Sequence, residues 1–181
     1  MNDLLRWTFE TLKNEGLAMN WLAQRREEWA PLLASRLRYL MEGATFILIC
    51  DDEREWFEKY FLSNINRKNR ARPMLPFVPL RALYPRPETL ESEEDLRLLS
   101  DMLGIAFPNG YIFFYVGKTS AKLAKIAKSS ELSYMWLFDE RDRQNGFFLS
   151  SEDELLDVKL LQLFRIFDKS IDAALFGEVS L

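Results

Sequence analysis

The chain has 181 residues, of which 48% are hydrophobic and 14% aromatic, enough for one domain with a sizeable buried core. Its formal net charge of -4 gives it no overall attraction to DNA or to anionic lipid. It contains no histidine and one cysteine, Cys50, which excludes intrachain disulfides, histidine-dependent catalytic triads and almost every type of zinc site.

Two helices are predicted before the first strand, over Asn2–Asn14 and Asn20–Met41. The apolar face of the first would be formed by Leu5, Phe9 and Leu12. Pro31 should lie at a bend or break of the second helix, and Gly43 ends it. The first segment lacks the continuous apolar core of a signal peptide, and no other apolar run could span a bilayer. We therefore expect a soluble, cytoplasmic protein.

Strands and helices alternate in the rest of the chain. The predicted strands are Ala44–Cys50, Leu75–Leu80, Gly110–Val116, Leu132–Phe138 and Gly146–Leu149. The predicted helices are Trp56–Ile65, Leu90–Leu103, Ser120–Lys128 and Glu152–Phe176. Pro76 and Pro79 indicate that the second strand lies at an edge, because each proline removes a donor from the hydrogen-bond ladder. The alternation predicts an α/β fold with a mainly parallel sheet.

The far end of the predicted sheet leaves two topologies open. The connection Asp139–Asn145 is short for a parallel crossover, and Asn145-Gly146 can turn a hairpin, which would make the fifth strand antiparallel. The same connection could instead hold a single helical turn. Ser151 is a plausible cap for the acidic start of the last helix.

The segment YVGKTSAKLA resembles a phosphate-binding loop in composition. A Walker A loop needs a glycine five residues before its Gly-Lys pair, so that backbone N–H groups can wrap the phosphates. That position is Ile112, inside the predicted strand. We therefore interpret Gly117–Ser120 as a tight turn in which Thr119 or Ser120 caps the next helix. A helix N-terminus with Lys118 and two hydroxyls could still bind an anion weakly.

Acidic residues follow two of the predicted strands. Asp51, Asp52 and Glu53 come after the first, and Asp139 and Glu140 after the fourth. Carboxylates at strand ends occur in Mg²⁺-dependent phosphoryl-transfer sites. No spacing rule joins these two groups, so the simpler interpretation is that acidic residues favour the positive end of a helix. The sequence assigns no catalytic, metal-binding or cofactor-binding residue.

A short basic run, NRKNRARP, follows the helix predicted after the first strand. Its cations are Arg67, Lys68, Arg70 and Arg72. The glycines and aromatic residues that accompany cations in nucleic-acid-binding segments are missing from it. A solvated loop therefore explains the run better than a nucleic-acid contact does.

The last helix has more apolar residues than a single buried stripe requires. They are Leu155, Leu156, Val158, Leu160, Leu161, Leu163, Phe164, Ile166, Phe167 and Ile171. This surplus, and the aromatic residues of the N-terminal helices, favour packing against another subunit; the alternative is burial within one chain. By periodicity Leu175 and Phe176 cannot face the same core, so one of them should be exposed as a candidate partner contact.

Four segments resemble the HobA family of small bacterial proteins that bind the replication initiator DnaA. They are WFEKYFLSNIN (Trp56–Asn66), RPMLPF (Arg72–Phe77), SYMWLFDE (Ser133–Glu140) and LLDVKLLQLFRIFDKSIDAALFGEVSL (Leu155–Leu181). The resemblance implies a fold similar to that of DiaA and of sugar-isomerase (SIS) domains. We then expect a single three-layer α/β domain over residues 1–181, with a five-stranded, mainly parallel sheet in flavodoxin-like order, two N-terminal helices and a long C-terminal helix.

The resemblance also implies a function. It implies a homotetramer, a dimer of dimers with oligomer contacts from residues 1–41, and no enzymatic activity or cofactor. This tetramer would bind the N-terminal domain of DnaA and promote its assembly at the origin, contacting DNA only through DnaA. In the similar DiaA proteins a Leu-Phe pair at the end of the last helix belongs to the initiator-binding surface. The matching positions here are Leu175 and Phe176, and we assign Asp172 to the same surface.

The alternative function is that of an SIS-type enzyme or sensor that binds a sugar phosphate. Its ligand would lie at the switch point of the sheet, between the loops Cys50–Glu53 and Gly117–Ser120. Three acidic residues in the first of these loops would repel a phosphate. The chain also lacks a histidine for the proton transfer of an isomerase.

Overall fold

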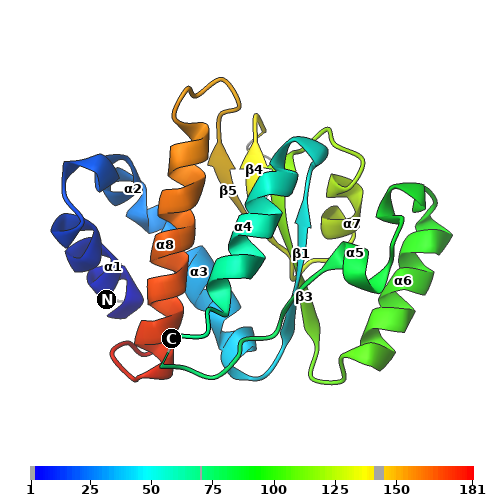
Figure 1. Cartoon of the computed structure of the whole chain (residues 1–181), viewed down its shortest axis with the longest axis horizontal. Helices are drawn as coiled ribbons and strands as arrows, with labels where there is room; N and C mark the ends of the chain where they lie inside the picture. The colour runs from blue at the N-terminus through cyan, green and yellow to red at the C-terminus, as the bar shows by residue number, and fades with distance from the viewer. Residues whose placement is uncertain (1–2, 70, 141–144) are drawn as a thin grey trace. The chain divides into compact units, whose positions relative to one another are not determined.

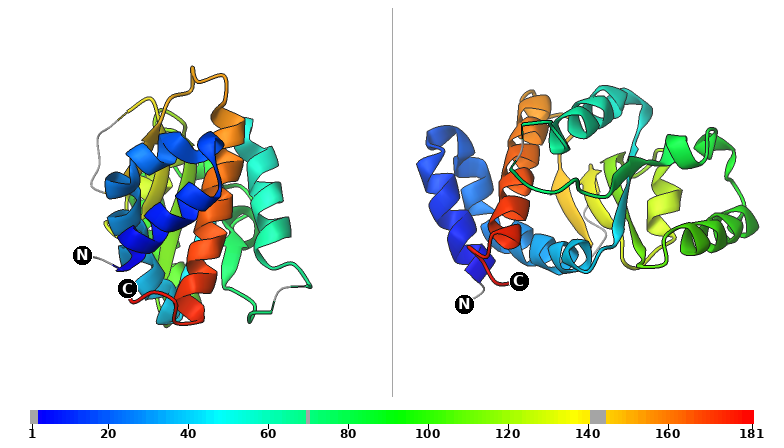
Figure 2. Two further views of the ribbon diagram at one scale, coloured as in Figure 1. Left: turned by 90° about the vertical axis from the view of Figure 1, so that its left-hand side faces the viewer. Right: turned by 60° about the horizontal axis from the view of Figure 1, so that its bottom comes forward.

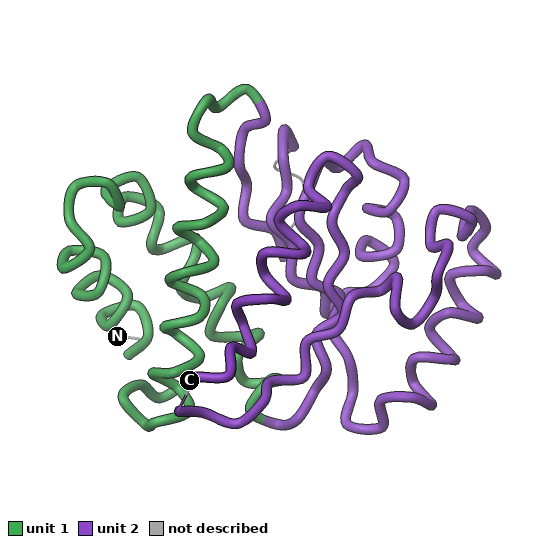
Figure 3. The backbone as a smooth tube through the Cα atoms, in the orientation of Figure 1, with its two compact units in different colours: residues 1–41, 152–181 green, residues 42–151 purple. Residues whose placement is uncertain are grey.

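The computed structural model describes residues 3–69, 71–140 and 145–181. The chain divides into two compact units, residues 1–41 with 152–181 and residues 42–151 (Figure 3). The first unit is helical and the second contains the sheet. The expectation of a single domain stays a prediction. No helix in the described part of the chain is long and apolar enough to cross a membrane.

The second unit contains a five-stranded sheet in which all neighbouring strands are parallel (Figure 1). Its strands are β1 (Thr45–Cys50), β2 (Phe77–Pro79), β3 (Tyr111–Lys118), β4 (Tyr134–Phe138) and β5 (Gly146–Leu149). The order β2-β1-β3-β4-β5 confirms the predicted α/β fold and flavodoxin-like order. The proline-containing β2 lies at one edge, as predicted.

The fifth strand runs parallel to β4, with Met135 opposite Gly146 and Leu137 opposite Phe148. The hairpin alternative is therefore wrong. The reason is visible at Asn145, whose carbonyl accepts the N–H of Met135 at 3.1 Å. Asn145 thus lies beside the start of β4 and cannot turn the chain at its end. The alternative of a helical turn in this connection involves residues 141–144, which lie outside the described residues.

Helices cover both faces of this sheet (Figure 1). They are η2 (Asp52–Arg54) and α4 (Glu55–Ile65), then α5 (Leu80–Leu83), η3 (Pro87–Thr89), α6 (Glu93–Ala106) and α7 (Ala124–Lys128). Successive strand residues point to opposite faces. On one face the rings of Phe114 and Trp136 lie 5.5 and 5.9 Å from Phe61 and Phe57 of α4. On the other, the neighbouring strand residues form one apolar core with α5, α6 and α7.

The first unit consists of helices, with α1 and α8 side by side (Figure 2). Its elements are α1 (Asp3–Asn14), η1 (Leu17–Met19), α2 (Asn20–Gln24), α3 (Arg26–Met41) and α8 (Leu156–Leu175). The buried face of α1 is formed by Leu4, Thr8 and Leu12, so the predicted face is wrong by one residue for two of its members. Phe9 is 46% exposed and lies under the guanidinium of Arg26 at 5.1 Å. Phe9 thus makes a cation–π contact at the surface instead of packing in the core.

The predicted helix Asn20–Met41 is interrupted at Arg25, whereas Pro31 lies inside α3. The helix therefore breaks at Arg25, six residues before Pro31, and not at the proline as predicted. The helix tolerates Pro31 because this residue is on the exposed side of α3. The carbonyl of Glu27, which loses its helical donor, also belongs to an exposed residue and can be hydrated.

The last helix, α8, begins at Leu156, and Ser151 is not its cap. The N-cap of α8 is Leu155, which offers no side-chain hydrogen bond, and the carboxylate of Asp153 accepts the N–H of Leu155 at 2.9 Å just before the helix. Most of the apolar surplus of α8 is buried within the chain. Its buried residues are Leu156, Leu160, Leu163, Phe164, Ile166, Phe167, Asp168, Ser170, Ile171 and Ala173. For α8 the structure thus favours the alternative of burial within one chain.

Candidate functional site

The carboxyl ends of β1 and β3 are joined by a buried carboxylate. Asp51, which follows β1 and is 4% exposed, accepts the backbone N–H of Lys118 through Oδ2 at 2.7 Å. Gly117 adopts φ +152, and a Cβ at this position would lie 2.5 Å from the same Oδ2. The two strand ends therefore approach so closely that only glycine fits. A phosphate would need this N–H group, which the protein already uses.

The remaining charges at this edge pair with one another. Lys118 Nζ lies 2.8 Å from Glu53 Oε1. The buried Arg54 forms ion pairs with Glu53 and, at 3.8 Å, with Asp51, and its guanidinium lies 4.8 Å from the ring centroid of Phe138. Each cation thus has a carboxylate of the same edge as its partner. The charged side chains at this edge therefore form an ion-pair network with one another.

The pKa shifts at this edge follow from burial and pairing. Burial raises the pKa of Asp51 and, more strongly, that of the Cys50 thiol, so Cys50 is no reactive thiolate. The hydrogen bond from Lys118 lowers the pKa of Glu53. Hydrogen bonds from the side chain of Ser151 and from its N–H, which donates to Asp139 at 2.7 Å, lower the pKa of Asp139. Cys50 and Asp51 line a pocket of about 270 Å³, but Asp51 is engaged by the N–H of Lys118 and the raised pKa keeps the Cys50 thiol protonated, so we assign neither a role as general acid or base.

The turn after β3 differs from its predicted form. The helix α7 begins at Ala124 and carries no side-chain cap, so the prediction that Thr119 or Ser120 caps it is wrong. The carbonyl of Lys118 instead accepts the hydroxyl of Tyr115 at 2.7 Å and the N–H of Ala121 at 3.2 Å. These bonds hold the chain in turns before α7. Because α7 does not begin at Lys118, the weak anion site predicted there is not supported. The described residues also include no group of three or more His, Cys, Asp or Glu residues that could hold a metal ion.

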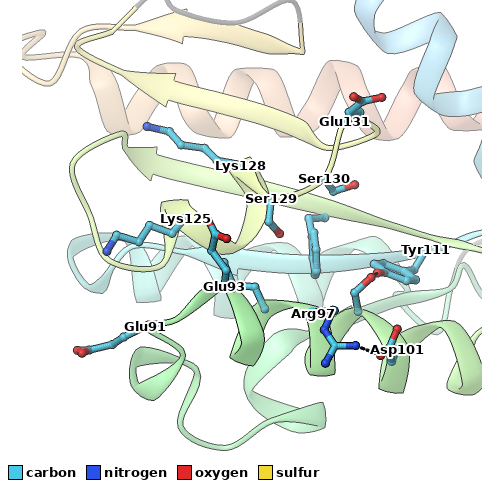
Figure 4. Close-up of a pocket in the computed structure, with 13 residues that line it drawn as sticks. Glu91, Glu93, Arg97, Asp101, Tyr111, Lys125, Lys128, Ser129, Ser130 and Glu131 are labelled. Atoms are coloured by element: carbon cyan, nitrogen blue, oxygen red, sulfur yellow. Dashed lines mark hydrogen bonds and ion pairs between the residues drawn. The ribbon is translucent and has the colours of Figure 1, made fainter.

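A groove of about 780 Å³ lies between α6 and α7 of the second unit (Figure 4). Its charges are of both signs, and Arg97 lies 3.9 Å from Asp101. Its floor includes Tyr111, whose hydroxyl lies 2.8 Å from that of Ser100. Tyr111 begins β3, so the groove reaches the amino ends of the strands, whereas open α/β sheets bind ligands at the carboxyl ends. We assign no chemistry to it.

The basic run after α4 is partly structural. Arg72 is buried and donates through Nη2 to the carbonyl of Ile65 at 2.6 Å. Arg67 is hydrogen-bonded to the side chain of Asn64. Arg70 lies outside the described residues. The run therefore supports the local chain more than it offers cations to a nucleic acid.

The C-terminal end of α8 is closed by backbone bonds that present one aromatic ring. Gly177 adopts φ +72, and the N–H groups of Gly177 and Glu178 donate to the carbonyls of Ala174 and Ala173 at 3.4 and 2.8 Å, a Schellman motif. Phe176 is the C-cap and is 58% exposed, whereas Leu175 is half-buried. This confirms that one member of the pair is exposed.

The predicted site residues lie together on the last turn of α8. Asp172 is half-buried, and its carbonyl accepts the N–H of Phe176 at 2.9 Å. Residues four apart share a helix face, so these two side chains project on the same side, with Leu175 next to them. The structure places the three residues together; their role as a binding surface stays a prediction.

A neighbouring pocket was not predicted. It has a volume of about 330 Å³ and is lined by Trp7, Thr11, Asn14, Glu15, Lys169, Asp172, Ala173 and Glu178. Glu15 forms ion pairs with Lys169 and, at 2.9 Å, with Arg165. These partners lower the pKa of Glu15, the hydrogen bond from Lys169 having the largest effect. No local pattern could reveal this pocket, because its walls come from opposite ends of the chain.

Comparison with known proteins points to one family. The sequence matches the family model of HobA, a DNA replication regulator, over residues 1–181. It is 30% identical over 189 residues to the DNA replication regulator protein HobA of Helicobacter pylori (strain ATCC 700392 / 26695), covering all of both chains. The fold matches HobA in the crystal structure of a HobA–DnaA (domain I–II) complex from H. pylori with a TM-score of 0.76 and 28% identity, covering 100% of each chain. It matches the crystal structure of H. pylori HobA with the same score and identity, covering 100% of this chain and 99% of that one.

Proposed function

Since the chain belongs to the HobA family of DNA replication regulators, we propose that it is a non-enzymatic, cytoplasmic adaptor that binds the N-terminal region of DnaA and promotes its assembly at the origin. The observation that carries this proposal is the full-length structural likeness to a HobA that was crystallised with domains I–II of DnaA. Contact with DNA is then made through DnaA, in keeping with the net charge of -4.

The last turn of α8 is the docking surface in this proposal. Phe176 is exposed at the helix end, with Leu175 and Asp172 beside it. Aromatic side chains are enriched among the few interface residues whose truncation costs about 2 kcal/mol or more of binding free energy. The Schellman motif holds the Phe176 backbone in place, which limits the entropy lost on docking.

The closed network at the carboxyl end of the sheet supports an adaptor over an enzyme or sensor. Asp51 occupies the N–H group of Lys118 that a phosphate would use, and Glu53 pairs with the ammonium of Lys118. A sugar phosphate would have to displace both carboxylates. We therefore assign no catalytic role to this edge.

A homotetramer, built as a dimer of dimers, completes the proposal. One feature that supports self-association is an exposed apolar stripe on α6, formed by Leu98, Met102 and Ile105 at helical spacing. Leu17, in the segment 1–41 to which we assign oligomer contacts, is 85% exposed. Four linked binding sites raise the effective concentration of DnaA, because each further docking event is intramolecular.

The test is calorimetric titration of the purified chain with domains I–II of DnaA from the same organism. We expect a saturable complex, and light scattering should give the free protein four times the 21.4 kDa of one chain. Absence of binding up to about 0.1 mM, which corresponds to a binding free energy weaker than about -5.5 kcal/mol, would contradict the adaptor. A monomer that still binds DnaA would contradict only the tetramer.

A further inference from the structure

The pocket between α1 and α8 is small and continuous with the exposed end of α8. Asp172 belongs both to the pocket and to the last turn of α8, one turn before the exposed Phe176. The volume of about 330 Å³ is at the lower end of the range of about 300–1,000 Å³ for ligand pockets. A partner that covers Phe176 therefore reaches the pocket, which has room for a single long side chain.

The charges that line this pocket indicate which kind of partner side chain it can bind. Three carboxylates line it, from Glu15, Asp172 and Glu178, against the single ammonium of Lys169. Glu15 is already matched by Lys169 and Arg165. Glu178 forms no ion pair with another described residue. The carboxylate of Glu178 thus favours a cation at this position.

Two further features favour a cation at this position. The pocket lies beside the C-terminal end of α8, a helix of 20 residues, where the helix dipole attracts positive charge. Trp7 of α1 also lines the pocket, and aromatic side chains attract ammonium and guanidinium groups. A bare metal ion fits less well, because the described residues include no group of three or more acidic or other ligating residues that could hold one.

We propose that this pocket receives a lysine or arginine side chain of the docking partner, next to the apolar contact made by Phe176. The inference rests on the proposed function. It adds Trp7 of α1 and Glu178 to the docking surface and assigns the site a basic partner residue. Phe176 then supplies apolar contact area. The carboxylates of Asp172 and Glu178 fix the position in which the partner docks.

The test compares charge reversals at two exposed glutamates by calorimetric titration with domains I–II of DnaA. Glu178→Lys reverses a charge of the pocket, and Glu154→Lys makes the same change in net charge before the start of α8. We expect Glu178→Lys to weaken binding about 10-fold or more, and Glu154→Lys to change it less than about 2-fold. Charge reversal of one surface lysine or arginine of the DnaA domain should weaken binding to the wild type and restore binding to Glu178→Lys.

The outcomes separate the two proposals. Equal binding by the two glutamate variants, with binding weakened in Phe176→Ala, would overturn the basic-residue pocket and leave the adaptor intact. Absence of binding by the wild type would overturn the adaptor and this inference with it. Salt dependence gives a measurement without substitutions: the wild-type affinity should fall as ionic strength rises, and a salt-independent affinity would contradict the ion pair.

Discussion

The carboxyl end of the sheet in the second unit and the end of α8 in the first both gather carboxylates and cations, yet they use them differently. At the sheet edge Asp51 binds the N–H of Lys118, and the other charges pair among themselves. At the end of α8, Phe176 remains 58% exposed beside an open pocket. At the position where open α/β sheets bind ligands, the protein thus uses its own carboxylates to engage the N–H and the cations, while a helix end offers an exposed aromatic side chain.

The largest expected effect is on stability, at the carboxyl end of the sheet. Gly117→Val should lower the free energy of unfolding by about 3 kcal/mol or more, because φ is +152 and a Cβ would lie 2.5 Å from the buried carboxylate of Asp51. Denaturant titration measures this. The control is Gly104→Ala in α6, where no atom lies within 4 Å of the new Cβ and about 0.5–1 kcal/mol should be gained. Equal stabilities of the two variants would show that the edge is not closely packed.

The next effect is on binding and leaves the fold unchanged. Phe176→Ala should weaken binding to domains I–II of DnaA about 30-fold, equivalent to about 2 kcal/mol, while the free energy of unfolding changes by less than about 0.5 kcal/mol. Calorimetric titration and denaturant titration give the two values. Met74→Ala, at an apolar and more exposed position of the second unit, should change neither. If Phe176→Ala were less stable but bound DnaA as tightly as the wild type, Phe176 would be a structural residue and not a contact residue.

A smaller effect concerns the ion pairs of the first unit. Glu15→Gln should cost about 1 kcal/mol of unfolding free energy at pH 7. Lys169 and Arg165 lower the pKa of Glu15 below 4.5, so this stabilisation is present above about pH 4.5 and disappears as the pH falls through the folded-state pKa. Unfolding free energies of wild type and variant should therefore converge in acid. Glu10→Gln, on the exposed side of α1, is the control with no expected difference.

The smallest effect has the opposite dependence on pH. Burial raises the pKa of Asp51 above 3.8, so protonation favours the folded state, and the contribution of Asp51 to stability rises as the pH falls through its folded-state pKa towards 3.8. Asp51→Asn should change stability by less than about 1 kcal/mol at pH 7, because relief from burying a charge offsets the weakened contact with Arg54. The advantage of the wild type should then grow towards acid. An advantage that shrinks would mean that pairing outweighs burial at this residue; Asp52→Asn, exposed next to it, is the control.

Much of the architecture could be predicted because it depends on local patterns. Continuous apolar runs such as Ala44–Cys50 identified the buried strands, and Pro79 indicated the edge strand. The errors concern choices between nearly equivalent local states. The observed face of α1, break at Arg25 and start of α8 differ from the predicted ones by one to six residues, because tertiary contacts such as that between Phe9 and Arg26 decide between such states.

The sequence by itself determined the α/β class, the resemblance to the HobA family and the exposure of one member of the pair Leu175 and Phe176, because these follow from composition, periodicity and motif. Only the tertiary structure decided the direction of β5, the closure of the edge between Asp51 and Lys118, and the pocket that joins Glu15 to Glu178. The physical reason is distance along the chain: hydrogen bonds and ion pairs between residues far apart in sequence leave no local signal, and form only when the chain has folded.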